Sequence, residues 1–111
     1  MKRGDVYLAS AGSGYSGKPR PVVVVQPDVL GELSSVVVCP LSTSSPVDGR
    51  LRLGVEADDS NGLDGDSVIM VDKVTAVAVA KFGPRIGALG PSLLRRLNRS
   101  LALVVGLSQP V

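Results

Sequence analysis

The run of four valines at 22–25 constrains the fold of this chain more than any other feature. Consecutive β-branched side chains favour an extended strand, because branching at Cβ restricts the side chain in a helix and suits a pleated sheet. The run is too short for a helix and has no polar residue to face water, so both faces of the strand should be buried. A second Val-rich run at 35–41 has the same character. The sequence therefore predicts buried strands over 22–26 and 35–41.

Other short segments also alternate apolar with polar residues, and Gly-, Pro-, Ser- and Asp-rich turns separate them. Further strands are predicted over 5–9, 51–55, 67–71, 74–80 and 81–89, the last with a bend at Gly83-Pro84. Loops are predicted over 10–19 and 58–66. Six or seven short strands of this kind indicate a small antiparallel barrel or a sandwich. A barrel is favoured, because closure would remove Val-rich edges that invite aggregation.

The C-terminal segment has a helical pattern instead. Gly90 suits an N-cap and Pro91 the first helical position, while Gly106 suits the C-terminal end. Apolar residues recur between these ends at a spacing of 3.6 residues: Leu93, Leu94, Leu97, Leu101, Val104 and Val105. The opposite face carries three arginines, Arg95, Arg96 and Arg99. One amphipathic helix is therefore expected to end a mainly β fold.

Length and composition bound both the organisation and the chemistry. A chain of 111 residues has room for one domain, over 1–111, and its net charge of +2 permits a nucleic-acid partner. The chain has no histidine, which excludes a Ser-His-Asp triad and a histidine metal site. The single cysteine, Cys39, excludes an internal disulfide and is expected to be a buried, inert thiol. With no phosphate-binding glycine motif either, neither a metal nor another cofactor is expected.

The N-terminal residues and the apolar runs predict a location. No apolar stretch follows the positive charges of Lys2 and Arg3, so no signal peptide is expected. No apolar run approaches the roughly 20 residues that a membrane-spanning helix needs. The sequence therefore predicts a cytoplasmic protein without a membrane partner.

Three polar features fall where predicted strands begin or end. Arg20 lies between Pro19 and Pro21, and its planar guanidinium suits a phosphate, although a solvated arginine is the alternative. The hydroxyl residues 42–45 follow a strand, where they would bind a phosphate or simply satisfy a turn. Asp72-Lys73 follows another strand and would form either part of a site or a turn-side ion pair.

Together these features resemble the MazF/PemK family of toxin endoribonucleases from type II toxin–antitoxin systems. The resemblance runs from about Lys2 to Leu107. It is carried by Arg3-Gly4-Asp5-Val6-Tyr7, Lys18-Pro19-Arg20-Pro21 with the valines after it, Val36-Val37-Val38-Cys39-Pro40-Leu41-Ser42, Asp66-Ser67-Val68, Asp72-Lys73-Val74 and the terminal helix. The opening motif and the Arg-Pro motif are the most specific parts.

The resemblance implies a fold, an activity and partners. It implies an SH3-like (CcdB/PemK-like) antiparallel barrel with a C-terminal α-helix, acting as a homodimer. It implies sequence-selective cleavage of single-stranded RNA without a metal, and inhibition by a MazE-like antitoxin with an acidic C-terminal segment. Arg20 takes the position of one catalytic residue of the family. Ser42 takes the position of the other, usually a threonine, so Thr43 is an alternative.

The residues present suit that chemistry. RNA supplies its own nucleophile, the 2′-hydroxyl, so the protein must orient this group and stabilise an anionic transition state. Arg20 suits the stabilisation, and Ser42 would hold the phosphate or the 2′-hydroxyl. Lys18 and Lys73 would attract the RNA backbone, with further RNA contacts predicted at Ser16, Thr43 and Asp72. Tyr15, in the loop that differs from many family members, would stack on a base or belong to the surface.

Two other functions stay open at this point. A CcdB-like toxin poisons a topoisomerase through its C-terminal helix without cutting RNA, and this chain has a well-formed helix pattern. A barrel serving only as a binding module is the third possibility. The presence of Arg20 and Ser42 at the nuclease positions favours the endoribonuclease.

Overall fold

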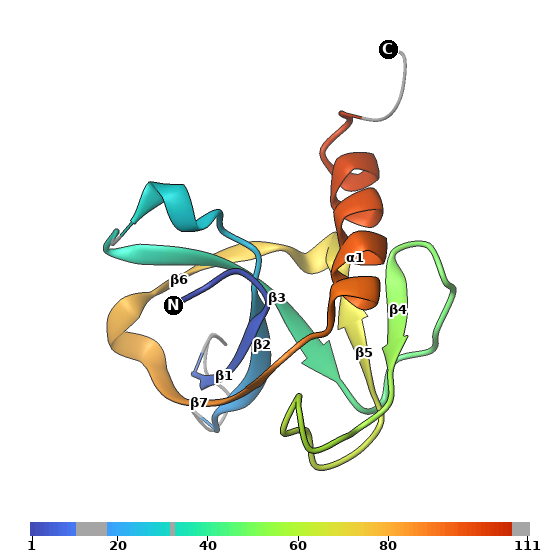
Figure 1. The fold of residues 1–111 in the computed structure, drawn as a ribbon, viewed down its shortest axis with the longest axis horizontal. Coiled ribbons are helices and arrows are strands. Elements are labelled where there is room, and N and C mark those ends of the chain that lie inside the picture. The colour runs from blue at the N-terminus through green and yellow to red at the C-terminus, as the bar shows by residue number, and fades with distance from the viewer. Residues whose placement is uncertain (11–17, 32, 108–111) are drawn as a thin grey trace.

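The computed structural model describes residues 1–10, 18–31 and 33–107 of the chain. Within these residues the fold is mainly β with one C-terminal helix, which confirms the predicted fold class (Figure 1). The strands are β1 (Asp5–Ala9), β2 (Arg20–Val24), β3 (Ser35–Ser42), β4 (Arg52–Val55), β5 (Ser67–Met70), β6 (Thr75–Ala78) and β7 (Phe82–Ala88). The helix is α1 (Pro91–Val104), and three 3₁₀ turns are η1 (Asp28–Leu30), η2 (Val71–Lys73) and η3 (Val79–Lys81).

All strand pairs are antiparallel, and the strands lie in the order β4-β5-β3-β2-β1-β7. The eight-residue β3 is the centre of the sheet, because it pairs with three other strands. Its first half pairs with β6 from Ser35 to Val38, its middle with β2, and its last two residues, Leu41 and Ser42, with β5.

The valines at 22–25, in and directly after β2, are buried on both faces of the sheet, as the continuous apolar run predicts. Val23 and Val25 belong to a core that includes residues from β3, β4, β5 and α1. Val22 and Val24 belong to a second core, with Val36, Val38 and Val77 among its members. A T-shaped contact between Tyr7 and Phe82, with ring centroids 5.6 Å apart, borders this second core. The β2 strand therefore lies between two apolar layers.

Strand ends differ from the sequence predictions where the chain makes bulges or 3₁₀ turns. The strand predicted over 22–26 runs from Arg20 to Val24, because the amides of Val25 and Gln26 both donate to the carbonyl of Val37. Such a shared acceptor breaks the regular ladder. The strands predicted over 67–71 and 74–80 are also shorter in the structure. The first ends where η2 begins, and the second ends where η3 begins.

The predicted closure of the barrel by a strand ladder is wrong. In the described part of the chain, β4 and β7 end the sheet and do not pair with each other. Instead, the loop between β4 and β5 covers β7: the amide of Ala88 donates to the carbonyl of Ser60 at 2.9 Å. A Cβ on Gly87 would lie 2.3 Å from the carbonyl carbon of Asn61, so the two segments are in close contact. The edge is protected by a loop rather than by a neighbouring strand.

The loop that covers β7 is itself held by a buried amide. Asn61 is only 4% exposed, and its Oδ1 accepts the backbone N–H groups of Asp58 and Leu63. Its Nδ2 donates to the carbonyl of Glu56 at 2.8 Å. A buried side chain that satisfies three backbone groups fixes the loop conformation. The segment over 58–66 is irregular, as predicted, but well anchored.

The opening Arg3-Gly4-Asp5 motif joins the first strand to the rest of the fold. The Arg3 Nε donates to the carbonyl of Val25 at 2.9 Å, and the nearly buried Asp5 forms an ion pair with Arg85 at 3.1 Å. Gly4 has a φ of +93°, and a Cβ there would lie 2.9 Å from the Leu94 side chain of α1. This motif, one of the two most specific parts of the sequence resemblance, therefore holds the fold together.

One face of α1 packs on the first core through Leu97, which is fully buried. Ser100 donates from its hydroxyl to the carbonyl of Arg50, so the helix also holds the loop before β4. In Figure 1 the helix lies beside β4 and β5, and its C-terminal end extends away from the sheet. The helices of the described residues include none with the length and apolar character to span a membrane.

Candidate active site

Arg20 is the first residue of β2 and is exposed. Its backbone is held in the sheet opposite Ala9 of β1, and Pro19 and Pro21 restrict the chain on either side. Within the described residues its guanidinium forms neither a hydrogen bond nor an ion pair. A rigid strand end thus presents an uncommitted cation to solvent, as the sequence predicts.

Ser42 is the last residue of β3, opposite Val68 of β5, and is half-buried. Its Oγ accepts the backbone N–H of Ser44 at 3.1 Å and lies 3.2 Å from the Ser44 hydroxyl. This local turn fixes the position of the Ser42 oxygen. Thr43 follows outside the strand and is exposed. The turn interpretation of residues 42–45 is therefore correct for Ser42 and Ser44, whose hydroxyls lie within hydrogen-bond distance with either one as donor.

The sheet directs Arg20 and Ser42 to the same face. Side chains alternate along a strand, so Arg20 shares the face of Val22, and Ser42 shares the face of Pro40. Val22 and Pro40 are register partners, and this is the last pair between β2 and β3. Arg20 and Ser42 each lie two residues beyond it, on adjacent strands, where β3 pairs with β5 through Leu41 and Ser42.

The other predicted RNA-binding residues fall in three places. Lys18 is exposed and lies two residues before β2, and Ser16, like Tyr15, falls outside the described residues. Asp72 and Lys73 are exposed residues of η2. The structure does not bring η2 into register with Arg20, but η2 directly follows β5, the partner of Ser42.

Asp72 has a partner that the sequence does not predict. Arg52 of β4 donates from Nε to Oδ1 at 2.7 Å and from Nη2 to Oδ2 at 2.9 Å. The hydrogen bonds from Arg52 hold the pKa of Asp72 below the usual carboxyl value, and the same pair raises the pKa of Arg52. The turn-side ion pair proposed as an alternative for Asp72-Lys73 thus exists, but with Arg52. A signal was available, because Arg52 alternates outward from the buried Leu53.

Asp48 orders the loop between β3 and β4. Its Oδ1 accepts the backbone N–H groups of Arg50, Leu51 and Arg52 at 2.8–2.9 Å. These hydrogen bonds, that from Arg50 first, hold the pKa of Asp48 below the usual carboxyl value. The loop that leaves Ser42 therefore returns to the sheet in one conformation.

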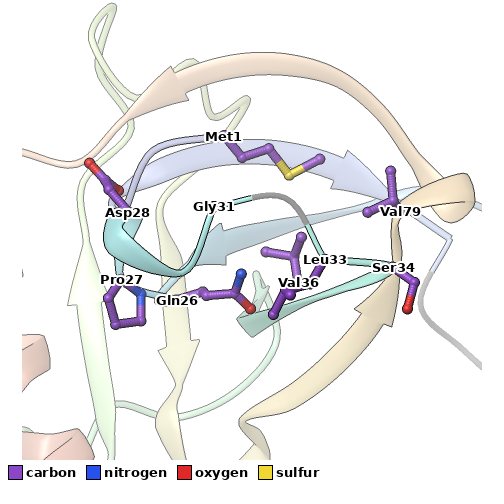
Figure 2. Close-up of a pocket in the computed structure, with 9 residues that line it drawn as sticks. All are labelled: Met1, Gln26, Pro27, Asp28, Gly31, Leu33, Ser34, Val36 and Val79. Carbon is purple, nitrogen blue, oxygen red and sulfur yellow. The ribbon is translucent and has the colours of Figure 1, made fainter.

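An apolar hollow lies away from these residues (Figure 2). It has a volume of about 500 Å³ and is lined mainly by apolar side chains around η1 and the start of β3, including Leu33 and Val36. Two of its polar side chains are already engaged: Asp28 accepts the N–H of Arg3, and Gln26 accepts that of Val37. No lysine or arginine lines it, so it lacks the guanidinium fork that suits a phosphate.

Known proteins resemble this chain along almost its whole length. A probable endoribonuclease MazF of Mycolicibacterium smegmatis is 38% identical over 97% of this chain and 99% of its own length. Endoribonuclease EndoA of Bacillus subtilis is 26% identical over 96% of both chains. The fold is shared with the Mycobacterium tuberculosis toxin MazF-mt6, at a TM-score of 0.78 and 24% identity, covering 95% of this chain and 99% of that one.

Two further solved structures contain such a fold beside a second protein. One is a mycobacterial endoribonuclease in complex with its cognate antitoxin, with a TM-score of 0.76, 23% identity and 99% coverage of both chains. The other is a MazE–MazF complex of Deinococcus radiodurans, with a TM-score of 0.74, 15% identity and 97% coverage of both chains. The family model for PemK-like, MazF-like toxins matches residues 2–105. The chain therefore belongs to the PemK-like, MazF-like toxin family of type II toxin–antitoxin systems.

Proposed function

We propose that this chain is an endoribonuclease toxin that cleaves single-stranded RNA with Arg20 and Ser42. The observation that carries the proposal is the full-length match to an endoribonuclease at 38% identity, combined with two polar residues that end neighbouring strands on one face. The alternatives, a CcdB-like toxin acting through its helix and a non-catalytic module, are not favoured, because three relatives matched along the chain are named endoribonucleases.

The reaction uses a nucleophile that belongs to the substrate. The 2′-hydroxyl loses its proton to solvent water as its oxygen attacks the neighbouring phosphorus and forms a new P–O2′ bond. The P–O5′ bond breaks, and the 5′-oxygen takes up a proton from solvent water. Negative charge increases on the non-bridging phosphate oxygens during attack. The Arg20 guanidinium donates hydrogen bonds to these oxygens, and such bonds strengthen as the charge develops.

Ser42 orients the reacting group beside Arg20. Its oxygen is fixed by the N–H of Ser44, and its hydroxyl turns from Ser44 to donate to the phosphate or to the 2′-hydroxyl when RNA binds. Lys18, Lys73, Thr43 and Ser16 contact the RNA on either side, and the ion pair with Arg52 reduces the repulsion between the Asp72 carboxylate and phosphate. A guanidinium is always protonated at working pH, so Arg20 does not serve as a general base.

The family also suggests how the protein is organised in the cell. We propose that the single domain over 1–111 acts in the cytoplasm as a homodimer and is held inactive by a cognate antitoxin. Support for an antitoxin partner comes from two similar proteins, one solved in complex with its cognate antitoxin and the other as a MazE–MazF complex. An acidic antitoxin segment over the Arg20 surface would compete with RNA electrostatically.

The test is cleavage of single-stranded RNA in EDTA by the wild-type protein and by Arg20→Ala. The wild type should cut, and the variant should be slower by roughly 100- to 1,000-fold, the usual effect of losing one donor to a developing anion. Arg20→Lys keeps the charge but loses the fork geometry, so it should recover only part of the rate. Intact RNA with wild type, or equal cutting by Arg20→Ala, would contradict the proposal.

A further inference from the structure

A cluster of arginines covers the outer face of α1 and the adjacent loop. Arg95, Arg96 and Arg99 are exposed on the helix, and Arg50 is exposed on the loop that Ser100 holds. We call these four residues the helix arginines. Two hollows meet at this cluster: one of about 240 Å³ is lined by Arg50, Arg96 and Arg99 among others, and one of about 400 Å³ by Arg95, Arg96 and Arg99 with Ser92.

Among the described residues, the helix arginines have no acidic partner. Helix α1 contains no Asp or Glu, and among the described residues none of the four guanidinium groups lies within 4 Å of a carboxylate. Arg95 and Arg99 are four residues apart and Arg96 and Arg99 three apart, so like charges are direct neighbours on the helix. Like charges at this spacing destabilise a helix, and a bound anion would remove the repulsion.

Helix electrostatics give no other reason for these charges. Cations stabilise a helix when they lie in its last turn, near the partial negative charge of the C-terminus. The last turn of α1 has no basic residue, and its arginines lie in the first two-thirds of the helix. Contact between two copies of this face is also disfavoured, because a two-fold interface would bring the same cations together.

The chain links this surface to the proposed active site. Ser42 ends β3, and the segment that leaves it is fixed by Asp48 and returns at Arg50. Arg52, two residues further on, is paired with Asp72, so of the two arginines on this segment only Arg50 adds an unpaired charge to the helix arginines. No aromatic side chain lines either hollow, which fits contacts to phosphate rather than stacking on bases.

We propose that the helix arginines bind the phosphodiester backbone of the RNA strand outside the cleavage site. This inference rests on the proposed function, since it takes RNA as the substrate. It adds a second, sequence-independent contact surface, reached from Ser42 along the loop over 43–50. Its contribution should increase with RNA length and decrease with salt, as for all phosphate contacts.

The test compares two double variants that remove the same charge. Arg95→Gln/Arg99→Gln neutralises part of the cluster with a good helix former, and Lys2→Gln/Lys81→Gln removes two exposed lysines elsewhere. The probe is a 2′-O-methyl RNA of roughly 20 nucleotides, longer than the ~4–16 nucleotides of a typical single-strand site. It keeps the phosphates but lacks the nucleophile, so binding is measured without cleavage.

The helix variant should bind this probe more weakly than the lysine variant. The slope of log K against log salt should fall by about 1.4, at ~0.7 for each phosphate contact on a single strand. Arg50→Gln, outside the helix, should lower the slope in the same direction and provides a second test if the helix variant folds poorly. Equal slopes for the wild type and both arginine variants would overturn the proposal.

Two further measurements separate the possible failures. Cleavage of a roughly 6-nucleotide RNA, within a ~4–16-nucleotide site, should be unaffected by Arg95→Gln/Arg99→Gln, because the short strand does not reach the helix. If the wild type cuts no RNA but the slope still falls in the helix variant, the proposed function fails and the binding surface stands. If the helix variant loses affinity for a Glu-rich peptide and not for the RNA probe, the surface belongs to an acidic protein and the inference is wrong.

Discussion

Arg52 and Asp72 form a two-bond ion pair that joins β4 to η2, with donor–acceptor distances of 2.7 and 2.9 Å. The pair lies across the end of the β4–β5 hairpin, next to the register pair Arg52–Met70. It holds Asp72 in place beside Lys73, and it neutralises Arg52, the only arginine of β4. The geometry of the predicted RNA-binding pair Asp72-Lys73 therefore depends on a residue twenty positions away.

This ion pair should make stability depend on pH on the acid side. The hydrogen bonds from Arg52 lower the pKa of Asp72 from its ordinary value of 3.8. A carboxyl group whose folded pKa is depressed contributes stability above its unfolded pKa, and loses it as pH falls through the folded value. Urea unfolding should show Asp72→Asn less stable than wild type at pH 7, with the difference decreasing as pH falls below 3.8 and through the folded pKa of Asp72. The effect should be small, because both groups are partly exposed.

Asp59→Asn is the matched control for this measurement. Asp59 is an exposed carboxylate in the loop between β4 and β5, and no hydrogen bond or ion pair within the described residues involves its side chain. Its substitution should leave the pH profile of stability unchanged. A constant difference between Asp72→Asn and wild type from pH 7 to pH 3 would show that the ion pair is not its source.

The two adjacent hydroxyls, Ser42 and Thr43, should differ sharply in their effect on cleavage. Ser42→Ala removes a fixed oxygen on the face of Arg20 and should lower kcat by roughly 100-fold or more, as for other transition-state donors. Ser42→Thr keeps the hydroxyl and should stay active. Thr43→Ala should lose much less of the rate than Ser42→Ala, because Thr43 is exposed outside the strand and only contacts the RNA beside the reacting group. Single-turnover cleavage measures all three rates. A larger loss of rate in Thr43→Ala than in Ser42→Ala would show that Thr43, not Ser42, is the catalytic hydroxyl.

Two glycines at the contact between β7 and its covering loop should not accept a side chain. Gly62 has a φ of +70°, and a Cβ there would lie 1.9 Å from the carbonyl oxygen of Ile86. Gly87→Ala would place a Cβ 2.4 Å from the carbonyl oxygen of Ser60. Each change to Ala should destabilise the protein by about 3 kcal/mol or more, because backbone atoms cannot move aside cheaply.

Gly65 provides the control for both. It lies in the same loop with no atom near its would-be Cβ and no positive φ. Gly65→Ala should therefore be neutral or stabilise by about 0.4–1 kcal/mol, through the lower entropy of the unfolded chain. Thermal unfolding of the three variants tests this. If Gly87→Ala proves as stable as Gly65→Ala, the loop does not pack on β7 as described.

Cys39 should be unreactive in the folded protein. It is fully buried in the first core, and this burial raises the pKa of its thiol to about 12. Since the thiolate is the reactive form, a thiol reagent at pH 8 should label Cys39 only after unfolding. Rapid labelling of the native protein would indicate that the first core opens locally. Titration in urea, with absorbance of the released reagent, distinguishes the two outcomes.

The sequence predicts best those elements whose structure follows from the spacing of nearby residues along the chain. The valines at 22–25 predicted a strand buried on both faces, and the leucine spacing from Leu93 to Leu101 predicted α1. Arg20 and Ser42 could be placed at strand ends, because the apolar runs beside them mark where the strands lie. Their shared face follows from the register, which the sequence alone does not specify.

The features that could not be predicted depend on contacts between distant segments. Neither the pairing of Arg52 with Asp72 nor the role of Arg3-Gly4-Asp5 follows from alternation along one strand. The barrel closure was wrong because an edge strand can be protected in several ways, and a sequence does not distinguish a strand from a covering loop. The sequence predicts Arg95, Arg96 and Arg99 only as the polar face of a helix. Arg50 lies next to them because of the fold, which the sequence pattern does not show.

The loop over 56–66 has the composition of a surface connection, in which insertions and deletions are usually tolerated. Because it covers β7, its length is in fact fixed by the distance it must cross to reach Ala88. An epitope tag or a deletion in this loop would leave the amides and carbonyls of β7 open to a strand from another molecule. A site that composition suggests is safe for engineering is therefore one at which a change would open the edge of β7 to polymerisation.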